Sequence, residues 1–318
     1  MNFVRRSSRV LSSQLERIEI KFSYLIGYVY CLLANLCSSL RNLYVRKGFE
    51  IPHYQLHYFR VVSLTFVMYF ILRRQSVPLV SPSKKINKLL FFIGLFGLLA
   101  GASSFYGFQV IPLNEASVIF QTQPVISSIL AVLVLNESFD TIQYISVILC
   151  TGGVLLVAKP SFLFGETTTT SHQTIQRLPG TISLLFAASM GGVQSILVKK
   201  VVAFVNSNLS VFYIGLIPTL FGGFLILFEG VAPMNFDEWM ITLNIVIYGI
   251  LAQILYNRSF KFGYAGKLSM MGYSQIIFGF VLDFFILNSI PDIYSLIGAI
   301  LVFSCVLLRL YKSMTDES

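Results

Sequence analysis

The sequence contains polar side chains inside long apolar runs, and these residues are the candidates for a binding site. Gln121, Gln123 and Pro124 lie in the run from 114 to 135, and Arg60 lies in the run from 54 to 72. A polar side chain in hydrocarbon costs free energy unless it faces a partner or water. We therefore predict that Arg60, Gln121 and Gln123 contact a substrate.

Pro124 has a separate predicted role, because a proline near the middle of a helix removes one backbone hydrogen bond. The loosened backbone would serve a moving gate, although a tolerated kink explains the same residue. For Arg60 the sequence leaves three interpretations open. It binds an anionic substrate, pairs with an acid such as Glu115, or extends outward to the membrane surface.

A second set of polar residues lies in the apolar run from 265 to 287. Tyr273 and Gln275 are predicted to contact substrate, and Gln275 shares a helical face with Asp283 at steps of four. Asp283 is a candidate for ion or proton coupling, although an interfacial carboxylate has the same sequence signature. Weaker cavity candidates stand in other runs: Asn35, Tyr106, Gln194 and Gln253.

The sequence shows no spacing typical of a hydrolytic or metal site. It has no Walker, HExxH or GxSxG motif, and no pair of acids accompanies its histidines. His53 and His57 share a helical face, which a metal pair would use, but interfacial polar residues have that spacing more often. The four cysteines lie in apolar runs without CxxC spacing. We expect neither an enzyme nor a cofactor or metal.

The composition is that of an integral membrane protein. The 318 residues are 55% hydrophobic and 12% charged, and the mean hydropathy is +0.76, far too apolar for a soluble chain of this length. The net charge of +9 does not predict nucleic-acid binding, because the basic residues lie between the apolar runs. The predicted partners are a small-molecule substrate and the lipid bilayer, and a homodimer stays open.

Ten apolar runs have about the 20 residues that are needed to cross a hydrocarbon core. They cover residues 22–43, 54–72, 88–110, 114–135, 141–158, 180–203, 209–228, 239–260, 265–287 and 292–311. In the third run Gly94, Gly97, Gly101 and Ser104 recur at helical spacing, which predicts close helix packing.

The distribution of basic residues predicts the orientation. With the N-terminus in the cytoplasm, most of the 23 Lys and Arg lie on the cytoplasmic side, as the positive-inside rule requires. Both termini are then cytoplasmic, and Arg41 and Arg46 are among the few basic residues on the opposite side. The sequence does not indicate which membrane the protein occupies.

The two halves of the chain resemble each other at a nearly constant offset. At 152 residues, Ser117 matches Ser269, Gln123 matches Gln275 and Asp140 matches Asp292; at 153 residues, Ala34 matches Ala187 and Phe59 matches Phe212. Coincidence among apolar helices is the alternative to duplication. The expected organisation is a cytoplasmic tail at 1–21, a five-helix repeat at 22–158, a linker at 159–179, a second five-helix repeat at 180–311 and a tail at 312–318.

The stretch GFQVIPLNEASVIFQTQPVISSILAVLVLNESFD resembles the EamA-like branch of the drug/metabolite transporter superfamily. The matching features are a small-residue start, a proline within the helix and a polar corner, carried here by Ala116, Ser117, Pro124, Asn136 and Glu137. The resemblance covers most of residues 22–311. In the second half Ile276 and Ser289 depart from the pattern, which weakens the transfer of site residues.

The resemblance implies an all-α integral membrane fold of ten transmembrane helices, arranged as two inverted five-helix repeats around a central cavity. An odd number of spans in each repeat itself requires opposite orientations. The implied function is a multi-pass secondary transporter that moves a small organic metabolite by alternating access. The alternative is a non-transporting membrane scaffold or receptor-like subunit. Substrate, direction and coupling ion are not indicated.

Overall fold

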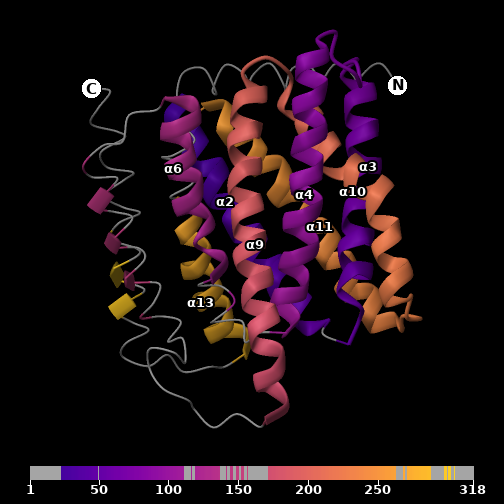
Figure 1. Cartoon of the computed structure of the whole chain (residues 1–318), viewed down its shortest axis with the longest axis vertical. Helices are drawn as coiled ribbons and strands as arrows, with labels where there is room; N and C mark the ends of the chain where they lie inside the picture. The colour runs from indigo at the N-terminus through magenta and orange to yellow at the C-terminus, as the bar shows by residue number, and fades with distance from the viewer. Residues whose placement is uncertain are drawn as a thin grey trace, which may run out of the picture.

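The computed structural model describes residues 23–48, 50–110, 119–136, 171–262 and 271–287, together with single positions between 116 and 304. In these parts of the chain all regular elements are helical. The predicted spans at 141–158 and 292–311 lie largely outside the described residues. The helices stand side by side in an upright bundle (Figure 1).

The helices fall close to the apolar runs of the sequence. They are α2 (Ser23–Lys47), α3 (His53–Arg74), α4 (Lys84–Val110), α6 (Gln123–Leu135), α9 (Ser171–Val202), α10 (Ser207–Glu229), α11 (Phe236–Phe262), the 3-10 turn η1 (Met271–Tyr273) and α13 (Ser274–Leu287). Among the described residues, 5 helices are long and apolar enough to cross a membrane. Their length and composition agree with the predicted all-α membrane fold.

The packing joins helices from the two halves of the chain. α2 packs against α11 and α13, α4 packs against α9 and α10, α3 packs against α10, and α6 packs against α9. Glycines permit some of these close approaches. A Cβ at Gly94 of α4 would lie 2.5 Å from the carbonyl oxygen of Tyr213 on α10. Small residues have this role in lipid, where close van der Waals contact holds helices together.

Two apolar clusters fill the bundle on either side of its middle. Along α4, Leu90 and Ile93 belong to one cluster, whereas Phe105 and Phe108 belong to the other.

Hydrogen bonds mark the two ends of the bundle. Asn208 donates to Gln75 over 3.0 Å at one end, and Gln55 exchanges hydrogen bonds of 3.0 and 2.9 Å with the backbone of Ala232 at the other.

The predicted helix from 114 to 135 is interrupted. Residues 119 and 120 are helical, Gln121 and Thr122 form a turn, and α6 begins at Gln123. Pro124 therefore lies in the first turn of α6, and the prediction that it breaks a hydrogen bond inside a helix was wrong. The missing N–H of a proline costs nothing in the first turn of a helix, where the N–H groups have no partner within the helix.

A second interruption lies at the corresponding place in the other half, where η1 precedes α13. The two interruptions touch each other. A Cβ at Gly272 would lie 3.2 Å from Cγ of Pro124 and 3.9 Å from Oε1 of Gln121. The bundle therefore has two broken segments in contact, and backbone of this kind is tolerated in a membrane only where protein or a cavity surrounds it.

Polar side chains of α2 satisfy the backbone around the second interruption. Asn35 donates from Nδ2 to the carbonyl oxygen of Met271 over 2.7 Å and to Oγ of Ser274 over 3.0 Å. Ser39 donates to the carbonyl oxygen of Gln275 over 2.8 Å. These bonds tie the 3-10 turn and the start of α13 to α2, so α2 holds the broken segment in place.

Candidate substrate-binding cavity

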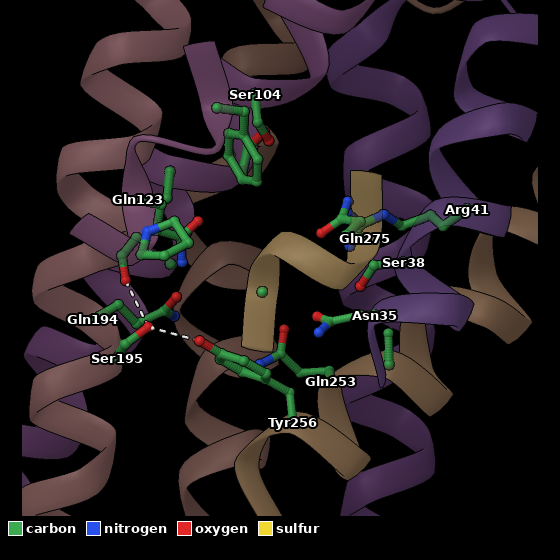
Figure 2. A pocket seen from close by; sticks show the side chains of 18 of the residues that line it. Asn35, Ser38, Arg41, Ser104, Gln123, Gln194, Ser195, Gln253, Tyr256 and Gln275 are labelled. Carbon is green, nitrogen blue, oxygen red and sulfur yellow. Dashed lines mark hydrogen bonds between the residues drawn. The ribbon is translucent and has the colours of Figure 1, made fainter. Parts of the chain in front are cut away.

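A cavity of about 150 Å³ lies at the centre of the bundle, where the two interruptions meet. A cavity that holds one water molecule has ~10–15 Å³ by the same measure, so this cavity has room for a small solute. Its walls come from α2, α3, α4, α6, α9, α10, α11 and α13, and from the residues just before α6 and α13. Figure 2 shows polar side chains directed into it from opposite walls.

Most of the predicted site residues meet at this cavity. Arg60, Gln121, Gln123 and Gln275 line it, and so does Pro124. Segments far apart in sequence thus bring their polar residues to one place, as expected of polar groups that avoid lipid. Substrate contact by these side chains and gating by Pro124 stay predictions.

One predicted residue, Tyr273, is not brought to the cavity. Tyr273 is 1% exposed within η1 and is absent from the cavity lining. A 3-10 turn has three residues per turn rather than 3.6, so the side chains around it do not keep the face of an α-helix. Asp283 belongs to α13, but its side chain lies outside the described residues.

Several amides line the cavity in addition to the predicted glutamines. Asn35, Gln194 and Gln253, which the sequence marks as weaker candidates, are all in the lining, whereas Tyr106 is not. Gln194 donates to the carbonyl oxygen of Ile93 over 3.1 Å. These neutral groups both donate and accept hydrogen bonds, so they suit the hydroxyl, carbonyl or amide groups of a solute.

Contacts between α9 and α11 lie along one side of the cavity. The hydroxyls of Ser195 and Tyr256, both cavity residues, lie 3.4 Å apart, as the dashed line in Figure 2 shows. Beyond them, Lys199 donates from Nζ to the carbonyl oxygen of Phe260 over 2.9 Å. Lys199 stands near the C-terminal end of α9, so these contacts lie toward the end of the bundle that carries Gln75 and Asn208.

Arg60 is the most deeply placed cation of the predicted site. It is 6% exposed, its Nη2 lies 3.5 Å from Nδ1 of His57, and its guanidinium carbon lies 5.8 Å from the ring centre of Phe105. Its Nε has no hydrogen-bond partner among the described residues. Glu115, the alternative partner, lies outside the described part of the chain. The ring contact and the histidine fix the guanidinium beside the cavity.

Arg41 is a cavity residue that the sequence analysis missed. We counted it with the basic residues on the side of the membrane opposite the cytoplasm, and the structure shows that it lies within α2 and lines the cavity. The signal was the recurrence of Asn35, Ser38 and Arg41 at steps of three, and all three line the cavity. Arg41 donates from Nε and Nη2 to Oδ1 of Asn42 over 3.2 and 2.9 Å.

Metal chemistry finds no support in the described residues, where no group of three or more His, Cys, Asp or Glu side chains is placed to hold an ion. The two histidines of α3 pack against rings instead. His53 lies 5.1 Å from Tyr106, and His57 lies 5.1 Å from Phe105 in an edge contact. The polar character of the cavity therefore comes from amides, hydroxyls and two arginines.

Comparison with known proteins agrees with this architecture. The model of the EamA-like transporter family matches residues 25–159 and again residues 178–311. A solved crystal structure superposes on 93% of this chain and 98% of its own chain with a TM-score of 0.72, at 16% sequence identity. That similarity shows that the two chains share a fold.

Several curated proteins with similar sequences are named as transporters or solute carriers. Solute carrier family 35 member G1 of Homo sapiens is 25% identical over 87% of this chain and 76% of its own length. The pseudopaline exporter CntI of Pseudomonas aeruginosa is 25% identical over 90% of this chain and 96% of its own length. The S-adenosylmethionine uptake transporter of Rickettsia prowazekii is 23% identical over 93% and 97%.

The family model covers both halves of the chain, the described helices are apolar, and the named relatives transport solutes rather than catalyse reactions. The chain is therefore a multi-pass integral membrane protein and not an enzyme, and it belongs to the EamA-like transporter family.

Proposed function

We propose that this protein is a secondary transporter that moves a small organic metabolite across a membrane by alternating access. The observation that carries the proposal is the polar cavity at the centre of an apolar bundle, lined from both halves of the chain. Polar groups inside an apolar bundle cost free energy unless they contact a partner or water, and a transported solute would be such a partner. Contact between two broken segments beside the cavity is typical of a membrane transport site.

The proposal includes ten transmembrane helices in two inverted repeats, 22–158 and 180–311, joined by a linker at 159–179. The helix pairing supports it. If the halves are exchanged, the α2 and α11 pair becomes the α9 and α4 pair, the α13 and α2 pair becomes the α6 and α9 pair, and the α3 and α10 pair maps on itself. Each of these pairs is in contact, and such symmetry allows two nearly equivalent states that open to opposite sides.

Within this arrangement we place both termini in the cytoplasm. Arg73 and Arg74 end α3, and Lys84 and Lys85 begin α4, so basic residues gather at the end of the bundle that carries Gln75. Basic connections favour the cytoplasmic side. The bonds of Ser195 to Tyr256 and of Lys199 to Phe260 then separate the cavity from the cytoplasm, and we propose that they break when it opens inward.

The relatives do not fix the substrate, because one is named as an exporter of pseudopaline and another as an uptake transporter for S-adenosylmethionine. A counterflow screen in proteoliposomes tests the function directly. Vesicles are loaded in turn with dicarboxylates, amino acids, sugar phosphates and nucleotide sugars, and uptake of the same labelled solute is measured.

We expect saturable uptake of one chemical class, accelerated by that solute on the opposite side of the membrane. Empty liposomes are the control. Purified protein that remains folded but accelerates no solute in any class would contradict the transport proposal and favour the scaffold alternative.

A further inference from the structure

We infer that the transported molecule is a small organic anion, and that Arg41 and Arg60 bind its negative group while the glutamines bind its uncharged part. The inference rests on the proposed transport function and adds the substrate class. Both arginines line the central cavity, one from α2 and one from α3.

The two arginine side chains pass close to the same residue of α11. The position that a Cβ would take at Gly249 of α11 lies 2.8 Å from Cδ of Arg60 and 3.5 Å from Cδ of Arg41. Because Gly249 has no side chain, the aliphatic parts of both arginine side chains have room against α11. Two cations this close, away from bulk water, repel each other, and a negative group between them would remove that cost.

The described acids do not offset these two charges. Side chains are described for three acidic residues, and none of them lines the cavity. Glu50 and Asp237 are exposed, and Glu238 accepts a hydrogen bond from the backbone of Asn235 over 2.7 Å. Glu115 and the side chain of Asp283 lie outside the described residues. The thiol-reagent experiment below measures the total electrostatic potential in the cavity, so its result includes any charge that these two acids contribute there.

The starts of the two broken helices add to the positive electrostatic potential in the cavity. α6 begins at Gln123 and α13 begins at Ser274, and the cavity is lined by Gln123 and Pro124 of α6 and by Gln275 of α13. The residue before α6, Thr122, makes no side-chain capping bond. The N-terminus of a helix carries a partial positive charge, so both starts favour a negative group in the cavity.

The arginines carry the specificity, because a guanidinium has a fixed fork of donors that matches a carboxylate or phosphate. Arg60 is held in position by Phe105 and His57, and its buried Nε has no hydrogen-bond partner among the described residues. Such a donor is costly until a ligand accepts from it. The amides of the opposite wall, Gln123 and Gln194, then suit the neutral part of the ligand, so the ligand is organic rather than a bare ion.

Charged thiol reagents test the potential of the cavity without knowledge of the substrate. A cysteine is introduced by Gln253→Cys, a cavity position on α11, and its reaction rates with anionic sulfonatoethyl and cationic trimethylammonioethyl methanethiosulfonate are measured in the full-length protein. We expect the ratio of anionic to cationic rate to exceed that of free cysteine. Adding Arg41→Gln and Arg60→Gln together should lower the ratio by about tenfold or more.

Two control variants show whether the rate ratio depends on positive charge at the cavity rather than on any change of an arginine in the protein. Arg60→Lys keeps the charge and should retain most of the ratio, and Arg46→Gln, at an exposed position of α2 outside the cavity lining, should leave it unchanged. A ratio that favours the cationic reagent, or one that the double glutamine variant does not change, would overturn the anion inference.

The outcomes for substrate class and for transport are separate. If the screen finds uptake of a neutral or cationic solute that survives Arg41→Gln and Arg60→Gln, transport stands and the anion inference fails. If the rate ratio behaves as expected but no solute is transported, the positive cavity stands and the transport proposal fails. Uptake of an anion that either substitution lowers about ten- to a hundredfold supports both.

Discussion

Replacing Gly94 by alanine is expected to destabilise the bundle by about 3 kcal/mol, at the upper end of the cost of overpacking. The added Cβ would lie 2.5 Å from the carbonyl oxygen of Tyr213 and 2.5 Å from Cγ1 of Ile217. A rotamer change of Ile217 relieves only the second contact, because the first is with the backbone of α10. The helices α4 and α10 must therefore separate, and the apolar contacts around them are lost.

The measurement is the thermal unfolding temperature of purified protein, compared with that of a matched glycine variant. Gly223 lies on α10, and a Cβ there would meet its nearest side-chain atom, Oη of Tyr58, at 3.7 Å. Gly223→Ala should therefore change stability by no more than about 0.5 kcal/mol. Equal unfolding temperatures for Gly94→Ala and Gly223→Ala would show that α4 and α10 are not packed as described.

Replacing Asn35 by leucine is expected to reduce transport by about tenfold or more, because a loss of about 1.4 kcal/mol in the stability of the transporting state has that effect. Asn35 holds the second interruption through its bonds to Met271 and Ser274. Loss of a donor at a buried site costs about 1–3 kcal/mol. The start of α13, which carries Gln275 into the cavity, would then lose its fixed position.

The control is the same substitution at an asparagine that makes only a local bond. Asn244 on α11 is partly exposed, and its Nδ2 donates to the carbonyl oxygen of Met240 one turn earlier, over 2.8 Å. Asn244→Leu should leave both the unfolding temperature and the uptake rate unchanged. The account of the broken helix would be wrong if Asn35→Leu transported as fast as Asn244→Leu.

The described helices follow from the length of the apolar runs, and the gathering of Arg60, Gln121, Gln123 and Gln275 was predictable for a second physical reason. Polar groups in an apolar run must find each other or water, so their convergence follows from solvation even when the path of the chain is unknown. Their roles in binding are not decided by convergence alone, and the experiments above address them.

The two helix interruptions were not predictable in the same way. Pro124 marks the first one in sequence, but whether a proline kinks a helix or starts one depends on the neighbours that satisfy the freed backbone. At the second, η1 carries no proline, and its geometry depends on bonds from Asn35 of a distant helix. Arg41 was misplaced because it stands two residues before the predicted end of the span at 43 and was counted with the outer surface, whereas α2 continues to Lys47.

The most direct test of the central claim is the labelling of single cysteines by a membrane-impermeant thiol reagent applied from each side of sealed vesicles. Cysteines replace Gln75 and Asn235, exposed at opposite ends of the bundle, and Gln253 in the cavity. The unsubstituted chain gives the background of the native cysteines. We predict that position 75 is labelled from one side only, position 235 from the other side only, and position 253 from both. Labelling of 75 and 235 from the same compartment, or of 253 from one side alone, would contradict a bundle with a centrally placed cavity that opens to each side in turn.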